Sequence, residues 1–395
     1  MREMKNSGVA WIGDVPENWE IVKIGQLFQC RNVKVNDTDF QPLSVSKGGI
    51  VPQMENVAKS DANDNRKQVL TGDFVINSRS DRKQSCGVSK LDGSVSLINT
   101  VLYGFDKDRV IPEYNNYLLK NYGFAEEFYR WGHGIVADLW TTRWQEMKNI
   151  EIPVPSIKTQ EDILSALRIK SKNISLLIFN QEQQIEKLKQ YKQSLITEVV
   201  TKGLNPNVPM KDSGTLKLGN IPDNWKIVRF KNVAILCNGK EVTSNNGNIP
   251  VYGSGGVFKY TDQPLFTGTS LLLGRKGTID NPMLVTDSFW TVDTMFYTSK
   301  IYGINPKYLY YACVGEIDFN YYKSGSVLPS MTQTEINNIF ITCPDRFEQK
   351  KIVDFLDKKC AKIDRLIAIK QEKINKLNDY KKSLIYEYVT GKKEA

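Results

Sequence analysis

The sequence predicts an α+β protein built as two tandem copies of one plan, in which a mixed α/β globule is followed by a long helix. Three observations lead to this prediction: a Pro-Trp motif that occurs twice, a helical stretch that occurs twice, and β-rich stretches between them that do not match. The chain has 395 residues, 41% hydrophobic and 10% aromatic, which is enough apolar material for more than one core. We therefore expect two domains related by an internal pseudo-twofold repeat.

The Pro-Trp motif lies in the stretch NSGVAWIGDVPENWEIVKI at 6–24 and returns as DSGTLKLGNIPDNWKIVRF at 212–230. Both stretches contain a Ser-Gly pair, a later Gly, a Pro-acid-Asn-Trp run and a Val-basic pair. Ser213 follows Ser7 by 206 positions (213 − 7). The same interval separates Pro16 from Pro222 and Trp19 from Trp225. Each copy therefore begins in the same way.

The helical stretches repeat at a shorter interval. IPVPSIKTQEDILSAL (152–167) matches ITCPDRFEQKKIVDFL (341–356), and KLKQYKQSLITEVVTKG (187–203) matches KLNDYKKSLIYEYVTGK (376–392). Pro344 follows Pro155 by 189 positions (344 − 155), so the middle of the first copy is longer. Gln160, Tyr191 and Leu195 match Gln349, Tyr380 and Leu384 in this alignment. A period of about 200 residues exceeds that of solenoid repeats and is typical of duplicated domains.

Each copy is expected to end in one long helix. Apolar side chains in 160–200 recur at three- and four-residue spacing with sevenfold returns, which predicts a coiled-coil seam. Pro155 and Pro344 precede the helices, and Gly203 and Gly391 close them. About 40 residues at 1.5 Å per residue give roughly 60 Å. We expect the two helices to pair as an antiparallel coiled coil through Ile163, Leu167, Ile178, Ile185, Leu188 and Leu195 of the first and Ile352, Leu356, Ile363, Ile367, Ile374, Leu377 and Leu384 of the second.

The middles of the two copies predict short strands. GDFVINSR (72–79), VLYGFD (101–106), TSLLLGRKG (269–277) and DTMFYTSK (293–300) are β-rich runs bounded by Gly, Asn and Asp. The stretch 201–214 has the Pro, Asn and Gly content of a linker. Each globule is therefore expected to be a mixed α/β fold.

Bulk composition narrows the class of protein. The net charge of +9 and pI near 9.0 favour a polyanionic partner, but only modestly for this length. Six dispersed cysteines without a CxxC pair, and one histidine, support neither a zinc site nor a disulfide framework. The N-terminus lacks the apolar core of a signal peptide, and no stretch approaches the roughly 20 apolar residues of a membrane helix. We expect a cytoplasmic protein with no membrane segment.

The sequence offers no convincing catalytic or cofactor site. GTSLLLGRKGT lacks the GxxxxGK[ST] spacing of a phosphate loop, and no Asn-Pro-Pro-aromatic tetrad of an amino-methyltransferase occurs. Asp345 and Glu348 are too close in sequence for a nuclease metal site and fit the start of a helix better. His133 has no acid-rich partner motif, which favours a loop residue or DNA contact over a general base. We expect no catalytic residue, metal or cofactor.

Basic and polar loops with interleaved aromatics remain. They are NSRSDRK (77–83), RWGHG (130–134), TTRW (141–144), CNGKEVTSNNG (237–247), VYGSGGVFKY (251–260) and GRKG (274–277). Arg pairs with guanine, Asn and Gln pair with adenine, and Lys and Ser bind phosphate, so these are residue types that read DNA grooves. Any one loop could equally be solvated surface. Their occurrence in both copies favours nucleic-acid binding.

Through these motifs the chain resembles the specificity subunit of type I restriction-modification systems over essentially all 395 residues. The resemblance rests on the IPxxWxxV motif at Ile221 and approximately at Val15, the two YKxSLIxExVT helix ends, and the YGSGG, GRKG and DTMFY runs of the second copy. It implies two target-recognition domains that each read half of an asymmetric, bipartite site in double-stranded DNA. It further implies helices that set the spacing of the half-sites and dock two modification (methyltransferase) subunits, restriction and motor subunits that join this core, and no catalytic activity in the chain itself.

The resemblance also assigns domains and contact residues. The implied parts are a first target-recognition domain at 1–155, the first conserved helix at 156–203, a linker at 204–214, a second target-recognition domain at 215–344 and the second conserved helix at 345–395. The expected DNA-binding residues are Ser78, Arg79, Arg82, Lys83, His133, Arg143, Lys240, Tyr252, Ser254, Lys259, Arg275 and Lys276. The first domain has no counterpart of YGSGG or GRKG.

Two other functions compete with this interpretation. The long helices and modest charge would also suit a coiled-coil scaffold that never contacts DNA. A stand-alone, sequence-specific nuclease is the second alternative, and the missing acidic cluster argues against it.

Overall fold

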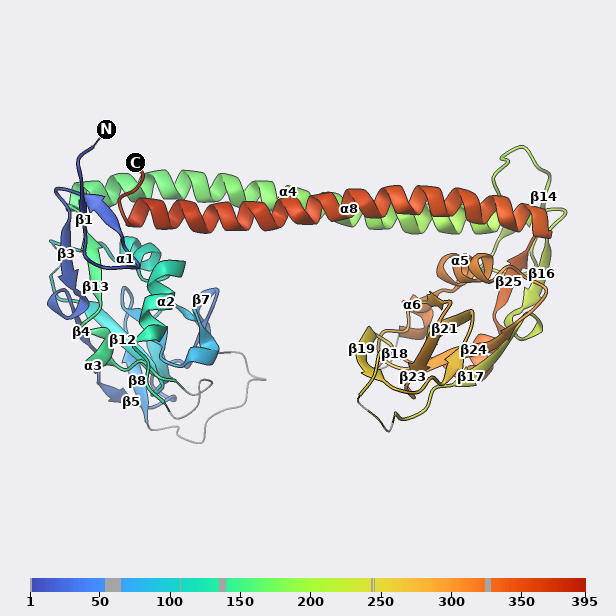
Figure 1. Ribbon diagram of the computed structural model, residues 1–395, viewed down its shortest axis with the longest axis horizontal. Helices are drawn as coiled ribbons and strands as arrows, with labels where there is room; N and C mark the ends of the chain where they lie inside the picture. Colours follow the sequence, from blue (N-terminus) through green and yellow to red (C-terminus); the bar gives the residue numbers. More distant parts are fainter. Residues whose placement is uncertain are drawn as a thin grey trace. The chain divides into compact units, whose positions relative to one another are not determined.

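The computed structural model describes residues 2–53, 65–106, 108–134, 140–242, 244, 246–323 and 328–395. The chain divides into two compact units, with Met1–Asn180 and Glu372–Ala395 in unit 1 and Gln181–Gln371 in unit 2. The long helices α4 (Ile157–Lys202) and α8 (Arg346–Val389) each contribute one part to each unit (Figure 1). The prediction of a mixed α/β protein with two long helices is confirmed. None of the described helices is both long and apolar enough to cross a membrane.

Both units share the same structural frame. In unit 1, β1 (Met4–Asn6) pairs with β2 (Asp14–Pro16), and β3 (Glu20–Lys23) pairs with β13 (Glu151–Val154). In unit 2, β14 (Met210–Asp212) pairs with β15 (Asn220–Pro222), and β16 (Lys226–Arg229) pairs with β25 (Phe340–Cys343). All four pairs are antiparallel, and a short 3-10 helix follows β3 and β16, at Ile24–Gln26 and Phe230–Asn232. The repeated sequence therefore forms repeated structure.

A buried glutamine fixes the start of each long helix. The Gln160 side chain donates to the carbonyls of Arg109 (2.7 Å) and Pro155 (3.0 Å) and accepts from the Ile111 amide (3.0 Å). Gln349, its counterpart in unit 2, donates to the Pro344 carbonyl (2.8 Å) and accepts from the Asn305 amide (2.7 Å). These bonds connect the helix start to the turn before α1 (Pro112–Leu118) in unit 1 and α5 (Pro306–Glu316) in unit 2.

The end of each long helix packs against the Pro-Trp motif of the other copy. Gly391, after α8, has a φ of +72°, and a Cβ there would collide with the Pro16 ring and lie 3.2 Å from Trp19. Gly203, after α4, has a φ of +77°, and its Cβ would lie 3.2 Å from Trp225. Only glycine combines the left-handed backbone with this close approach. The end of each long helix therefore packs directly against the Pro-Trp motif of the other copy.

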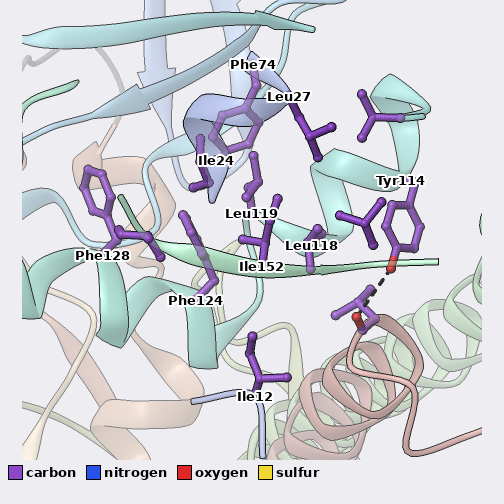
Figure 2. Packing of buried hydrophobic residues seen from close by; sticks show 14 of the residues in the cluster. Ile12, Ile24, Leu27, Phe74, Tyr114, Leu118, Leu119, Phe124, Phe128 and Ile152 are labelled. Carbon is purple, nitrogen blue, oxygen red and sulfur yellow. Dashed lines mark hydrogen bonds between the residues drawn. The ribbon is translucent and has the colours of Figure 1, made fainter. Parts of the chain in front are cut away.

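The core of unit 1 lies between its sheet, its helices and the two helix parts (Figure 2). It contains Phe74, Phe124, Phe128 and Ile152, and the buried Tyr114 hydroxyl donates to the carbonyl of Val389 in α8 (3.4 Å). The main sheet has the order β10-β9-β12-β4, with β4 at Phe28–Cys30, β9 at Phe74–Asn77, β10 at Cys86–Val88 and β12 at Asn99–Gly104. A second sheet has the order β11-β8-β5, with β5 at Lys34–Val35, β8 at Arg66–Val69 and β11 at Gly93–Ser96. The hairpin of β6 (Leu43–Ser46) and β7 (Gly49–Pro52) and the helices α2 (Tyr122–Arg130) and α3 (Trp144–Met147) complete the unit.

Unit 2 carries different sheets on the same frame. One has the order β17-β24-β21-β22, with β17 at Ala234–Asn238, β21 at Ser270–Gly274, β22 at Met283–Val285 and β24 at Met295–Ile301. The other has the order β19-β18-β23-β20, with β18 at Ile249–Gly253, β19 at Gly256–Thr261, β20 at Phe266–Thr267 and β23 at Ser288–Thr291. The short helices α6 (Phe319–Lys323) and α7 (Gln333–Asn338) follow α5.

Within each unit the two helix parts run in opposite directions. In unit 1, Lys381 donates to Ser175 (2.9 Å), and the Lys170 ammonium lies 4.9 Å from the Tyr388 ring centroid. In unit 2, the corresponding contacts join Lys370 to Gln184 and Lys192 to Asp364. The residues predicted to pair the helices are all buried or partly buried: Ile163, Leu167, Ile178, Ile185, Leu188, Leu195, Ile352, Leu356, Ile363, Ile367, Ile374, Leu377 and Leu384. Ile163 and Ile352, which match each other near the two helix starts, also pack into the globule cores.

A buried carboxyl group lies beneath the end of α4 in unit 2. Glu316 accepts from the Thr342 amide (2.9 Å) and contacts the Thr342 hydroxyl, which donates to the Val200 carbonyl (2.8 Å). Burial raises the pKa of Glu316 to about 8, against the opposing effect of the Thr342 hydrogen bonds. Glu316 is therefore mostly protonated at neutral pH in the folded chain.

We predict that Gln349→Ala destabilises unit 2 by about 1–3 kcal/mol, because the Asn305 amide and Pro344 carbonyl lose their buried partner. Urea unfolding combined with amide hydrogen exchange in unit 2 measures this loss. Lys350→Ala, at an exposed neighbouring position, is the control and should change stability by less than about 0.5 kcal/mol. Equal stability of the two variants would show that the glutamine does not fix the helix start.

We predict that unit 2 loses stability as pH rises from about 5 to about 8. The folded state keeps the Glu316 proton over this window, whereas the unfolded state, with a pKa of about 4.3, has released it. Glu316→Gln cannot ionise, so its stability relative to the natural chain should rise by on the order of 2–3 kcal/mol between pH 6 and pH 8.5. Amide exchange of unit 2 at several pH values provides the measurement. Parallel pH profiles for the two proteins would contradict the prediction.

Candidate nucleic-acid interface

The loop after β21 in unit 2 holds two basic residues at the surface. The amides of Arg275 (2.8 Å) and Lys276 (3.3 Å) donate to the Thr294 carbonyl, and the Arg275 carbonyl accepts from the Met331 amide (2.9 Å). The Arg275 guanidinium also donates to the Asp293 carbonyl (3.3 Å) and lies 5.9 Å from the Phe296 ring centroid. Backbone bonds on two sides therefore fix this loop, while Lys276 stays exposed and Arg275 half-buried.

Two more of the predicted contact residues of unit 2, Lys240 and Tyr252, are joined to the segment Trp290–Thr294 by hydrogen bonds and strand pairing. Lys240 donates its amide to the Thr291 carbonyl (2.8 Å) and accepts at its own carbonyl from the Trp290 indole (2.8 Å). Tyr252 pairs with Thr291 across the parallel strands β18 and β23. The sequence predicts Asp293 and Thr294 only as part of a β-rich run and does not single out Trp290, Thr291 or Val292, because these contacts join segments that are distant in sequence.

Ser254 and Lys259 belong to the same surface. A Cβ on Gly277 would lie 3.1 Å from the Ser254 hydroxyl, so the two loops touch. Lys259 lies opposite Val251 in the β18–β19 hairpin. We call Lys240, Ser254, Lys259, Arg275 and Lys276 the unit 2 loop cluster. Residues 243 and 245 of the predicted loop 237–247 lie outside the described residues.

Tyr252, predicted to contact DNA, is partly exposed and also packs within unit 2. Its ring packs edge-on against Phe289, with centroids 6.2 Å apart, in a small apolar cluster. Burial, followed by the charges of Tyr260 and Asp287, raises the pKa of its hydroxyl. Tyr252 therefore packs against the apolar cluster around Phe289 while part of its surface stays exposed, and its contact with DNA stays a prediction.

In unit 1 the structure joins three segments that are distant in sequence. Arg79 and His133 both form isolated bridges with Thr141, and the Thr142 amide donates to the Ser78 carbonyl (3.0 Å). A short 3-10 helix at Ser80–Arg82 follows, and Arg143 starts α3. We call Arg79, Arg82, Lys83, His133 and Arg143 the unit 1 loop cluster. Trp140, which is exposed and whose carbonyl accepts from the Ser80 amide (2.9 Å), lies at its edge and was missed by the sequence analysis.

Ser78 requires a correction. Its side chain is only 3% exposed, and its hydroxyl shares a hydrogen bond with Thr100 (3.0 Å). Ser78 lies at the end of β9, where the chain is covered by the segment before α3. Its hydroxyl therefore cannot reach DNA in this structure, and we remove it from the candidate interface.

The two clusters differ in electrostatics. In unit 1, Asp81 lies 3.1 Å from Arg79 and 3.6 Å from Arg82, and Glu126 lies 3.1 Å from Lys83. In the part of unit 2 that the structure describes, no carboxylate lies within ion-pair distance of Lys240, Arg275 or Lys276. Phosphate would therefore bind the unit 2 cations directly, whereas in unit 1 it would compete with internal carboxylates.

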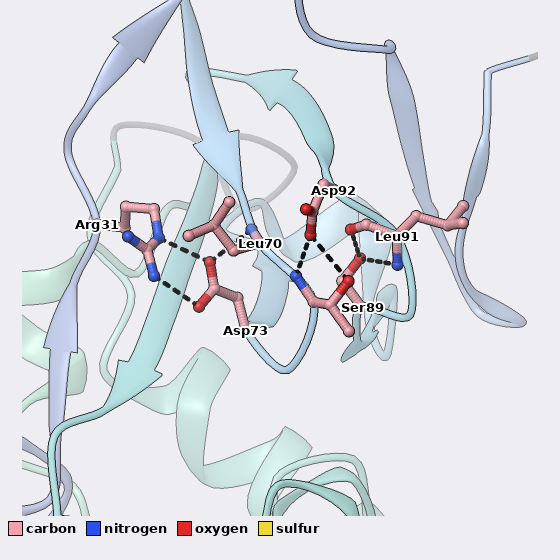
Figure 3. Close-up of polar contacts among 7 residues, drawn as sticks. Arg31, Leu70, Asp73, Ser89, Leu91 and Asp92 are labelled. Atoms are coloured by element: carbon pink, nitrogen blue, oxygen red, sulfur yellow. Dashed lines mark hydrogen bonds and ion pairs between the residues drawn. The ribbon is translucent and has the colours of Figure 1, made fainter.

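A further arginine of unit 1, Arg31, is partly buried and engaged in an internal ion pair (Figure 3). The Arg31 guanidinium donates twice to Asp73, at 2.7 and 3.0 Å, and Asp73 also accepts from the Leu70 amide (2.8 Å). Asp73 is buried, so this pair stabilises the turn between β8 and β9. Among the described residues, no group of three or more His, Cys, Asp or Glu side chains is arranged to hold a metal ion.

Part of the chain matches a known family model, and nearly all of it is similar in sequence to two curated proteins. Residues 222–379 match the family model of the type I restriction modification DNA specificity domain. The chain is 23% identical to the putative type I restriction enzyme MjaX specificity subunit of Methanocaldococcus jannaschii, over 96% of this chain and 95% of that protein. It is 24% identical to the MjaVIII specificity subunit of the same organism, over 96% and 93%.

A solved structure supports the fold. A chain from a study of complex assembly and conformational transition in the type I restriction-modification system superimposes with a TM-score of 0.70. The match covers 95% of this chain and 98% of that chain at 15% sequence identity, so it bears on the fold alone. Residues 222–379 thus match a type I restriction modification DNA specificity domain, and nearly the whole chain is similar in sequence to proteins named type I restriction enzyme specificity subunits.

Proposed function

We propose that this chain is a type I restriction-modification specificity subunit and that it reads an asymmetric, bipartite DNA target, with one half-site for each unit. The observation that carries the proposal is that the two units share a frame but differ in the sheets mounted on it. Unit 1 has sheets of four, three and two strands beside its frame, whereas unit 2 has two sheets of four. A common frame with different sheets suits a common task performed on two different sequences.

The loop clusters are the proposed contact surfaces. Lys240, Lys276 and Arg275 in unit 2 can bind phosphates, and an arginine of this kind can also pair with the guanine edge in the major groove. In unit 1, Arg82 and Arg143 are exposed, and His133 lies beside them. Backbone hydrogen bonds fix the loops of both clusters, so their side chains need little ordering when DNA binds.

The helices are proposed to set the spacing between the half-sites. At 1.5 Å per residue, the 46 residues of α4 and the 44 residues of α8 correspond to roughly 65–70 Å of helix. Two turns of B-DNA at about 34 Å each have a similar length. A change in helix length is therefore expected to change the number of bases between the half-sites.

The helices also offer repeated apolar surface for two modification subunits. Leu177 in unit 1 is 47% exposed and its counterpart Leu366 in unit 2 is 48% exposed. The matched tyrosines Tyr191 and Tyr380 are exposed as well. One leucine and one tyrosine thus occur in each unit, next to the Lys381–Ser175 contact in unit 1 and the Lys192–Asp364 contact in unit 2. Two equivalent patches suit two copies of one partner, and restriction or motor subunits would join the assembled core.

The proposal is tested by sequencing the methylome of the host with and without the gene. Loss of one asymmetric, gapped methylated motif would establish the target and its spacer together. An unchanged methylome in a host with active modification subunits would contradict DNA recognition and favour the coiled-coil scaffold.

We predict that Arg275→Ala lowers affinity for the half-site read by unit 2 by about 10- to 100-fold, because an arginine contact with a base is worth about 1–3 kcal/mol. Methylation of a plasmid library by the complete complex measures this effect. Arg346→Ala, at the start of α8 and outside the loop cluster, is the matched control and should methylate normally. Normal methylation by Arg275→Ala would contradict the assignment of this loop.

We predict that Leu177→Asp and Leu366→Asp each remove one modification subunit from the complex, because a charge on an apolar docking patch opposes burial. Native mass spectrometry should show one bound subunit for each single variant and none for the double variant. Lys172→Asp lies about 140° around α4 from Leu177 and should leave both subunits bound. Full occupancy in the double variant would place the docking surface elsewhere.

A further inference from the structure

The hairpin of β18 and β19 contains a bulge that leaves one aromatic residue without a cross-strand partner. Val251 lies opposite Lys259 and Tyr252 lies opposite Val257, so Phe258 is the extra residue in β19. A bulge interrupts the alternation of side chains between the two faces of a sheet and changes the direction in which they point. Because β19 is also the edge strand of its sheet, the hairpin can present Phe258 to a partner.

The outer strand of this hairpin exposes an apolar surface. Phe258 is 58% exposed and Tyr260 is 52% exposed, and Val257 between the tip and Phe258 is exposed too. Exposed apolar side chains on an edge strand favour unwanted pairing and aggregation when nothing covers them. Such a surface indicates a contact with a partner.

Phe258 lies close to the basic loop of the same unit. A Cβ on Gly253 would be 3.4 Å from two ring carbons of Phe258 and 3.9 Å from the Thr294 hydroxyl. The Thr294 carbonyl accepts from the amides of Arg275 and Lys276. Gly253 and Thr294 therefore connect the surroundings of the ring to the backbone of Arg275 and Lys276.

The surroundings of Phe258 favour DNA over a protein as the partner. The Lys259 ammonium lies 5.7 Å from the ring centroid, and Lys240 and Lys276 are exposed on the same loop cluster. A protein would need carboxylates for these cations next to an apolar pocket for the ring. DNA offers phosphates together with one apolar group in the major groove, the 5-methyl of thymine, which phenylalanine can contact.

We propose that Phe258 contacts the 5-methyl group of a thymine in the half-site read by unit 2, and thereby contributes to sequence specificity. This inference rests on the proposed function, because it requires unit 2 to read DNA. Phe258 adds an apolar contact to the polar contacts of Arg275 and Lys276. Discrimination at that base pair then depends on one methyl group.

The test combines a protein variant with a change of that single methyl group. The full chain, assembled with its modification subunits, is titrated by fluorescence anisotropy with target duplexes in which each half-site thymine is replaced in turn by deoxyuridine. For the natural chain, one replacement should weaken binding about fourfold, as expected for loss of one buried methyl. Phe258→Ala should weaken binding to the unmodified target about tenfold and show no further loss with that deoxyuridine, since the two changes remove the same contact.

Phe347→Ala is the matched control. Phe347 is an exposed phenylalanine of α8 with the Lys351 ammonium 4.2 Å from its ring centroid, and it lies outside the loop cluster. It should retain both the affinity and the deoxyuridine sensitivity of the natural chain.

The inference is overturned by a half-site without thymine, by additive losses for Phe258→Ala and deoxyuridine, or by loss of a modification subunit from the Phe258→Ala complex. The last would show that the hairpin contacts protein. If Arg275→Ala loses the half-site while Phe258→Ala behaves like the natural chain, the inference fails and the proposed function stands. If both variants bind and methylate normally, the assignment of unit 2 loops to DNA fails as well.

Discussion

The packing of each helix end against the Pro-Trp motif of the other copy is the contact on which the rest of the structure depends. Gly391 lies against Pro16 and Trp19 in unit 1, and Gly203 lies against Trp225 in unit 2. Neither contact can form within a single copy, because the helix end and the motif come from different halves of the chain. The helix end that packs against each globule therefore comes from the other copy in the sequence.

Hydrogen bonds to the last helical turn reinforce this packing. Tyr114 donates to the Val389 carbonyl in unit 1, and Tyr308 approaches the Val200 carbonyl at the same distance, 3.4 Å, in unit 2. Both tyrosines are buried, so they satisfy carbonyls that a helix end would otherwise leave without partners. In unit 2 this arrangement also includes Thr342 and the buried Glu316, which makes its stability depend on pH. The two frames are thus similar in geometry, and unit 2 adds a buried carboxyl group to this arrangement.

The two units share this frame, but the sheets beside it differ between unit 1 and unit 2. The β18–β19 hairpin and the loop after β21 have no counterpart in the sequence of unit 1, yet the frame strands pair in the same register in both units. The cations also differ, because carboxylates accompany them in unit 1, whereas Arg275 and Lys276 have none within ion-pair distance among the described residues. Specificity can therefore change in one unit without altering the helices proposed to dock the partners.

The sequence by itself determined the two-copy plan and the long helices, because repeated motifs and heptad spacing are local properties of the chain. It also located the basic loops, although it could not tell which of their side chains reach the surface. Only the tertiary structure decided that Ser78 is buried, that Tyr252 packs against Phe289 and that Phe258 is exposed. The same holds for the closing of each globule by the helix end of the other copy. Burial and proximity of this kind arise from contacts between segments far apart in sequence, and a linear pattern does not contain them.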